Sequence, residues 1–90
     1  MVKHLNIRVS GKVQGVFFRA STKEQADQLG VNGFVRNEPN GDVYIEVEGN
    51  EEKSKLFSDW CKRGPNSARV DSFKVEEADL KNFVSFEVRR

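Results

Sequence analysis

Apolar and polar residues alternate one by one along several short segments of this chain, a pattern that is typical of half-buried β-strands. The strands that this pattern predicts lie at residues 5–9, 34–36, 43–47, 73–75 and 84–88. Regular alternation would place Val70 on the opposite face of the fourth strand from Phe73 and Val75. This predicts a β-bulge at the start of that strand.

Two longer segments carry apolar residues at helical spacing instead. The first runs to about Leu29, where Gly30 gives a natural C-terminal stop. Ser21 and Glu24 have the spacing of a capping box, which would start this helix at Ser21, but we expect a slightly earlier start. The second helix is predicted to follow Asn50, a residue suited to the N-cap position. The apolar positions of the two helices are Phe18, Thr22, Ala26 and Leu29, then Leu56, Phe57, Trp60 and Cys61.

The elements therefore follow the order strand, helix, strand, strand, helix, strand, with a short extra strand at the C-terminal end. Between the second and third strands, Asn-Glu-Pro-Asn-Gly at residues 37–41 is a turn signature and predicts a hairpin. Two interlocked β-α-β units make the ferredoxin-like α+β fold, in which one antiparallel sheet carries both helices on one face. The 90 residues fit one such domain, spanning residues 1–90, and leave no room for a second.

This topology brings two distant segments together. In a split β-α-β unit the first two strands are parallel, so the loop at residues 11–19 lies at the same edge of the sheet as Asn37. Gly11 and Gly15 permit backbone shapes in which N–H groups turn inward. Arg19 adds a permanent charge whose planar fork matches phosphate oxygens. These parts can form an anion cradle, but a glycine pair alone equally fits a plain surface turn, and the Walker spacing is absent.

Three segments resemble a known family. The sequence GKVQGVFFR at residues 11–19 is similar to the first acylphosphatase signature, and GFVRNEPNGDV at residues 33–43 looks like the second. The sequence GPNSARV at residues 64–70 resembles the segment that precedes the family's fourth strand. The match covers nearly the whole chain in the right order. Two positions depart from the usual pattern, since Phe17 stands where many members have Gly and Phe34 stands where Trp is commoner.

The resemblance implies an enzyme that hydrolyses the carboxyl–phosphate anhydride bond of acyl phosphates without a metal, a cofactor or a phosphoenzyme. It implies that Arg19 binds the phosphate and that Asn37 holds the attacking water through its side-chain amide. Such a site would grip the phosphate and leave the acyl group largely free. The loop residues whose backbone N–H groups the resemblance assigns to phosphate binding are Gly11, Lys12, Val13, Gln14, Gly15, Val16, Phe17 and Phe18.

Charge and cysteine content argue against several other classes. The 15 basic and 14 acidic side chains give a net charge of +1, too small to favour nucleic acid or an anionic membrane surface. Cys61 is the only cysteine, which excludes an intramolecular disulfide and suits a reducing compartment. The N-terminal segment lacks the apolar run of a signal peptide. These features lead us to expect a cytoplasmic monomer with no nucleic-acid or membrane partner, and the resemblance implies a small acyl phosphate as its substrate.

Four further side chains are predicted to be structural. His4 is the sole histidine, which excludes paired-His metal motifs, and we expect it to be exposed at the start of the first strand. Glu46 and Glu48 share one face of the third strand and are expected to form a solvated surface. A cysteine phosphatase requires Arg six residues after its Cys, where this chain has Ser67. Cys61 is instead expected to pack in the core, because its neighbours are apolar and a free cysteine is usually buried.

Three alternatives remain at this stage. An RNA-recognition domain shares this strand order but needs aromatic residues on its central strands, where this chain offers Tyr44 beside acidic residues. A small-ligand regulatory domain is compatible with the same fold, although it would not need Arg19 and Asn37 together. A segment cut from a larger transferase is the third alternative, against which Met1 favours a complete chain.

Overall fold

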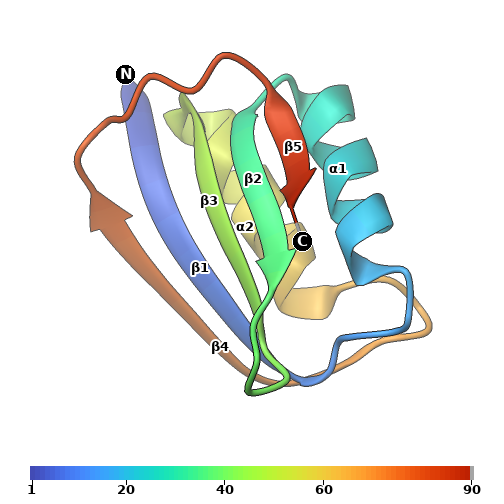
Figure 1. Ribbon diagram of the computed structural model, residues 1–90. Coiled ribbons are helices and arrows are strands. Elements are labelled where there is room, and N and C mark those ends of the chain that lie inside the picture. Colours follow the sequence, from blue (N-terminus) through green and yellow to red (C-terminus); the bar gives the residue numbers. More distant parts are fainter. Residues whose placement is uncertain (90) are drawn as a thin grey trace.

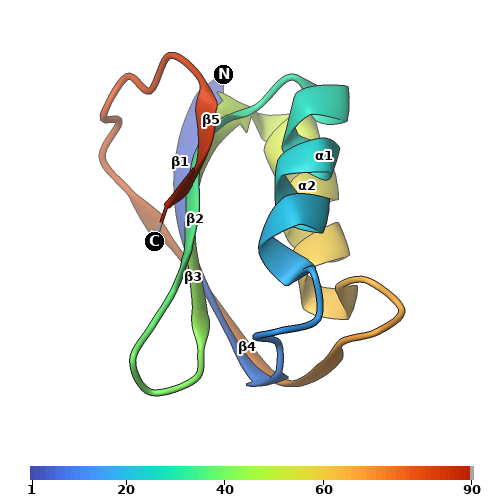
Figure 2. The same cartoon turned by 45° about the vertical axis from the view of Figure 1, so that its right-hand side comes forward.

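The computed structural model describes residues 1–89, which form a two-layer fold with a five-stranded sheet on one side and two helices on the other (Figures 1 and 2). Neither described helix is long and apolar enough to cross a lipid bilayer. The elements are β1 (Val2–Lys12), α1 (Phe18–Leu29), β2 (Asn32–Asn37), β3 (Val43–Asn50), α2 (Glu51–Arg63), β4 (Arg69–Ala78) and β5 (Phe86–Arg89). The predicted ferredoxin-like α+β class is confirmed.

The strand order across the sheet is β4-β1-β3-β2-β5. The first four of these strands pair antiparallel, as predicted. The extra strand β5 instead pairs parallel with β2, with Gly33 opposite Phe86 and Val35 opposite Val88, so the complete sheet is mixed. It also begins two residues later than the alternation predicts, because Val84 is 92% exposed and lies outside the strand. The chain crosses from one edge of the sheet to the other between β4 and β5 (Figure 1).

The bulge predicted from Val70 is present. The register between β1 and β4 shifts between Ser10 and Gly11, so that Gly11 pairs with Val70. Gly11 has a φ of 128°, and a Cβ added there would lie 2.8 Å from the backbone nitrogen of Asp71. Gly11 is therefore required where β1 and β4 approach each other closely.

Both helices have the ends that the sequence predicts. Helix α1 begins at Phe18, earlier than the capping-box position, and ends at Gly30 in the left-handed region. The side chain of Asn50 caps α2 by accepting a hydrogen bond from the backbone N–H of Lys53 at 2.8 Å. One position of the predicted apolar stripe departs from the pattern, because Leu56 is 47% exposed.

The hydrophobic core lies between the sheet and the two helices. Cys61 on α2 is fully buried in it, as predicted, and burial raises the pKa of its thiol far above the ordinary value. The thiol is therefore held in its neutral form, which is a poor nucleophile. The buried apolar residues of this core cluster are Ile7, Val9, Val13, Val16, Phe18, Ala26, Val31, Val35, Val43, Ile45, Val47, Phe57, Cys61 and Phe86.

Cys61→Ala is expected to fold and to keep full activity in the acyl phosphate hydrolysis that the sequence resemblance implies, because the thiol takes part only in packing. Loss of the buried sulfur should lower the free energy of unfolding by about 1 kcal/mol. Urea denaturation gives the stability change, and a turnover assay on the same preparation gives the activity. A folded variant with specifically lost turnover would show that the thiol has a chemical role.

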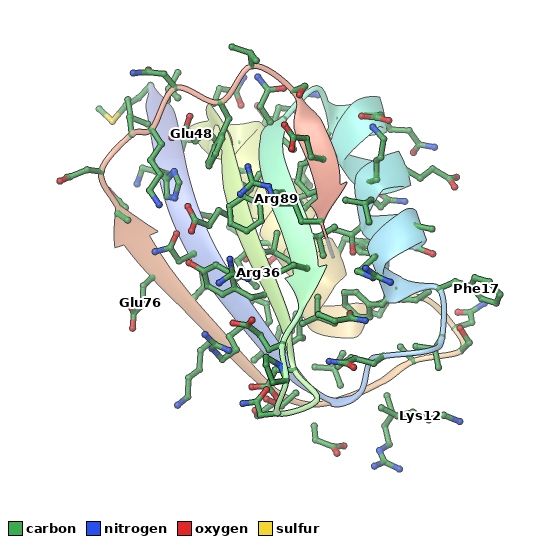
Figure 3. The ribbon with its side chains drawn as sticks, in the orientation of Figure 1. Lys12, Phe17, Arg36, Glu48, Glu76 and Arg89 are labelled. Atoms are coloured by element: carbon green, nitrogen blue, oxygen red, sulfur yellow. The ribbon has the colours of Figure 1, made fainter. Side chains whose placement is uncertain are left out.

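The structure corrects the predictions for His4, Glu46 and Glu48, which were expected at the surface. All three are buried on the face of the sheet that carries no helix, and Figure 3 shows Glu48 near the end of that face. Nδ1 of His4 lies 2.7 Å from Oε2 of Glu48, and Nε2 lies 3.0 Å from Oε1 of Glu46. The prediction of an exposed His4 and of a solvated acidic pair is therefore wrong.

The segment between β4 and β5 causes this burial. The ring of Phe83 stacks on His4, with 5.7 Å between the ring centroids. The backbone N–H groups of Lys81 and Phe83 both donate to the carboxylate of Glu48, and Nζ of Lys81 donates to Glu46 at 2.9 Å. Burial by itself raises the pKa of Glu48, but these N–H groups and the His4 ring outweigh it, so the pKa lies below the ordinary value of 4.5.

Acid is therefore expected to weaken the fold through Glu48. Because its pKa is lower in the folded protein than in the unfolded chain, the unfolded chain binds more protons at acidic pH. The stabilisation is fully present above the unfolded pKa and is lost as the pH falls through the folded pKa. Glu48→Gln should lower the free energy of unfolding at neutral pH by about 2 kcal/mol, since charged hydrogen bonds are lost.

Urea denaturation between about pH 6 and pH 3 measures this effect. Wild type should lose more stability over this range than Glu48→Gln does. Glu76→Gln is the matched control, because Glu76 is exposed on the outer strand β4 (Figure 3). Equal pH dependence in wild type and Glu48→Gln would contradict the role assigned to the buried carboxylate.

Candidate active site

A cavity of about 340 Å³ opens where the loop after β1 meets the start of α1 and the end of β2. This volume falls within the range of roughly 300–1,000 Å³ that is usual for small-molecule sites. The residues that line the cavity are Val13, Gly15, Phe17, Phe18, Arg19, Ala20, Asn37 and Val88. The loop after β1 and the end of β2 therefore meet at the same end of the sheet, as the topology predicts.

The loop is held in place from two sides. Nε2 of Gln14 donates to the backbone carbonyl of Glu38 at 2.8 Å and to that of Asp42 at 2.9 Å, which ties the loop to the β2–β3 turn. On the other side, Oγ of Ser67 donates to the carbonyl of Val16 at 2.8 Å. These contacts fix the backbone without using the N–H groups of the loop.

The backbone of this loop is shaped to present N–H groups. Gly15 has a φ of 73°, a left-handed conformation that glycine adopts without strain. Within the described chain, no hydrogen-bond acceptor is found for the backbone N–H groups of residues 15–20. Several of these groups belong to the first turn of α1, where the helix itself supplies no partner and where the helix dipole favours an anion.

Arg19 lies in the first turn of α1 and lines the cavity. Its Nη1 donates to the backbone carbonyl of Arg89 on β5 at 3.0 Å. A guanidinium carries five N–H donors, so this bond orients the side chain and leaves other donors available. The sequence did not reveal this support, because a carbonyl acceptor from a distant strand leaves no residue pattern.

Asn37 is the last residue of β2 and lines the same cavity. Its side-chain oxygen, Oδ1, is buried, and no group in residues 1–89 donates a hydrogen bond to it. Buried polar atoms in folded proteins almost always have a partner. Because Asn37 lines the cavity, its Oδ1 is a candidate acceptor for a hydrogen-bond donor of a bound molecule.

The structure divides the predicted loop residues into three groups. Gly11 and Lys12 belong to β1 and pair with β4, outside the lining of the cavity. Gln14 contributes through its tether, and the backbone of Val16 accepts the second tether. The predicted residues that do line the cavity are Val13, Gly15, Phe17, Phe18, Arg19 and Asn37.

The cavity is suited to an anion. Arg19 is the one charged residue in its lining among the described residues. No group of three or more His, Cys, Asp or Glu side chains in residues 1–89 could hold a metal ion. Arg19, the loop N–H groups and the start of α1 give this cavity a positive character.

Comparison with known proteins agrees with this geometry. The family model described as Acylphosphatase matches residues 5–88. An acylphosphatase of Pseudomonas paraeruginosa is 45% identical over 86 residues, which cover 96% of this chain and 94% of that protein. An acylphosphatase of Rubrobacter xylanophilus is 47% identical over 88 residues, which cover 97% of this chain and 80% of that protein.

A solved structure gives the same result at the level of the fold. The structure of an acylphosphatase from Coxiella burnetii is similar with a TM-score of 0.94 and 35% sequence identity, over 98% of this chain and 93% of that one. The shared sequence and the shared fold extend over the elements that build the cavity. The chain therefore belongs to the acylphosphatase family of enzymes, which hydrolyse acyl phosphates.

Proposed function

We propose that this enzyme hydrolyses the carboxyl–phosphate anhydride bond of small acyl phosphates by direct in-line attack of water. Asn37 holds the water, while Arg19 and the loop N–H groups hold the phosphoryl group. The observation that carries this proposal is that Asn37 lines the same cavity as Arg19 and has a buried Oδ1 for which residues 1–89 provide no hydrogen-bond donor. A water molecule donates the hydrogen bond that this oxygen lacks, and its own lone pair then faces the phosphorus.

The atoms, electrons and protons of the proposed reaction balance without a metal or a cofactor. The water oxygen forms a bond to phosphorus, and the bond between phosphorus and the bridging oxygen breaks with its electron pair moving to the carboxylate. A proton of the water ends on the released phosphate or in solution. Because a carboxylate is a good leaving group, the enzyme needs mainly to position the water and to stabilise charge on the phosphoryl oxygens.

The fixed donors around the cavity supply that stabilisation. Backbone N–H groups that are already oriented pay no reorganisation cost during the reaction. The Arg19 guanidinium adds charge-assisted hydrogen bonds in planar geometry. A neutral amide at position 37 orients the water without adding negative charge beside an anionic substrate. In this proposal the fixed N–H donors and Arg19 take the place of the magnesium ion that many phosphoryl-transfer enzymes use.

Purified protein is expected to release inorganic phosphate from benzoyl phosphate and not from a phosphate monoester such as phenyl phosphate. The rate should remain unchanged in excess EDTA and should gain nothing from added magnesium, because the described residues offer no ligand cluster. Colorimetric phosphate determination measures both results. Loss of activity on chelation, with recovery on adding metal, would overturn the proposed mechanism.

The proposal extends to the setting in which the enzyme works. We infer that residues 1–90 form one acylphosphatase-like domain that acts as a cytoplasmic monomer, with no nucleic-acid or membrane partner. The near-neutral charge and the single buried cysteine support this setting. Light scattering on the purified protein tests the oligomeric state, and a dimer that carries the activity would contradict it.

A further inference from the structure

Phe17 is the most unusual residue of the site. It has a φ of 61° and a ψ of 22°, which places a bulky non-glycine residue in the left-handed region at the N-cap of α1. Its side chain makes no capping hydrogen bond, and it is 81% exposed. The fold therefore bears the cost of a strained backbone and of an exposed aromatic ring at one position.

Packing does not account for this ring. Figure 3 shows the Phe17 side chain at the outer end of the loop that precedes α1, directed away from the sheet. The neighbouring Phe18, by contrast, is buried in the core. Phe17 nevertheless lines the mouth of the cavity, together with Ala20 three residues later. The two residues give this side of the mouth an apolar surface.

In-line attack decides which part of a substrate this surface meets. The entering water and the leaving carboxylate must lie on opposite sides of the phosphorus. Asn37 is the last residue of β2 in the sheet, whereas Phe17 directly precedes α1. The end of β2 and the start of α1 lie in different layers of the fold (Figure 2). If the water lies at Asn37, the acyl group points away from the sheet and towards the mouth that Phe17 lines.

We propose that Phe17 contacts the acyl group of the substrate and gives this enzyme a preference for acyl phosphates with an aromatic or bulky apolar acyl group. The inference rests on the proposed function for the nature of the substrate. The exposed ring stacks on or packs against the acyl group, which removes apolar surface of both partners from water. An acetyl group is too small to gain much from this contact.

Calorimetric binding of stable phosphonates tests the contact without turnover. Benzylphosphonate should bind wild type roughly tenfold more tightly than methylphosphonate. This ratio of affinities corresponds to the upper end of the free energy usual for one aromatic contact. In Phe17→Gly, which keeps the left-handed backbone without strain, the two affinities should come within about twofold of each other. Phe17→Tyr should retain the preference because it keeps the ring. Leu56→Ala, which removes another exposed apolar side chain away from the cavity, should also retain it.

Inorganic phosphate distinguishes a contact from a general effect on the loop. Its affinity should differ by less than about twofold between wild type and Phe17→Gly, because the variant keeps the backbone N–H of residue 17 and the ring does not touch the phosphoryl group. An unchanged preference in Phe17→Gly overturns the inference. An equal loss of affinity for all three anions also overturns it, because the residue would then act only by shaping the loop.

Hydrolysis of benzoyl phosphate and acetyl phosphate separates this inference from the proposed function. The two leaving groups differ in reactivity, but that difference is the same for every variant and cancels when variants are compared. Phe17→Gly should lower kcat/KM roughly tenfold for benzoyl phosphate and less than about twofold for acetyl phosphate. Hydrolysis of both substrates by wild type without a binding preference overturns the inference alone. A binding preference with hydrolysis of neither overturns the proposed function alone.

Discussion

Arg19→Gln is expected to lower kcat/KM by roughly 10³-fold, because the substitution removes the one charged side chain among the described residues that line the cavity. Charge accumulates on the phosphoryl oxygens as the bond to the carboxylate breaks, and a neutral amide stabilises that charge poorly. Competitive inhibition by inorganic phosphate should weaken as well, by roughly 10- to 100-fold, the usual worth of charge-assisted hydrogen bonds. Steady-state kinetics with phosphate as inhibitor measures both changes.

Two further variants separate charge from geometry at Arg19. Arg19→Lys keeps the positive charge but loses the planar fork, so it should recover part of the phosphate affinity and little of the turnover. Arg63→Gln removes an exposed arginine on α2, outside the cavity, and should behave as wild type. If phosphate still inhibits Arg19→Gln at the wild-type concentration, Arg19 is not the phosphate-binding group.

The fold could be predicted from the sequence because its main signals are local. Alternation defines strands, helical spacing defines helices, and the caps at Gly30 and Asn50 define where the helices end. Even the bulge beside Gly11 follows from a change of phase at Val70. The direction of β5 had no such signal, because the pairing partner of a short edge strand depends on where the long β4–β5 connection takes the chain.

His4, Glu46 and Glu48 show why the prediction of burial failed. Alternation shows that two residues share a face of a strand, but it does not show what covers that face. Solvent is the usual expectation on that face, since polar residues outside the core mostly meet water. In the structure the segment that carries Lys81 and Phe83 covers them and supplies their hydrogen bonds.

The sequence predicts that Arg19 and Asn37 lie close together, but it does not predict the hydrogen bonds that hold the loop in place. The topology alone places Arg19 and Asn37 at one edge of the sheet, and the structure puts both in the lining of one cavity. The supporting contacts of Gln14 and Ser67 are side-chain bonds to backbone carbonyls far away in the sequence. Such bonds depend on where other loops lie, so no spacing rule identifies them.

Asn37→Ala is expected to separate water positioning from substrate binding. The side chain comes from the end of β2, whereas phosphate is held by Arg19 and the loop N–H groups, so inorganic phosphate should inhibit the variant nearly as well as wild type. The attacking water would lose the acceptor that orients it, and kcat should fall by roughly 10²–10³-fold. Because Oδ1 makes no hydrogen bond within the described chain, the fold should lose little stability.

Asn37→Asp tests the same role with a change of charge and almost no change of shape. A carboxylate can still accept a hydrogen bond from water, but it also repels an anionic substrate. We therefore expect kcat to remain low and phosphate inhibition to weaken, unlike in Asn37→Ala. Circular dichroism and urea denaturation confirm that each variant is folded before its kinetics are compared. If folded Asn37→Ala turns over benzoyl phosphate at nearly the wild-type rate, Asn37 does not position the water, and another group in the cavity must do so.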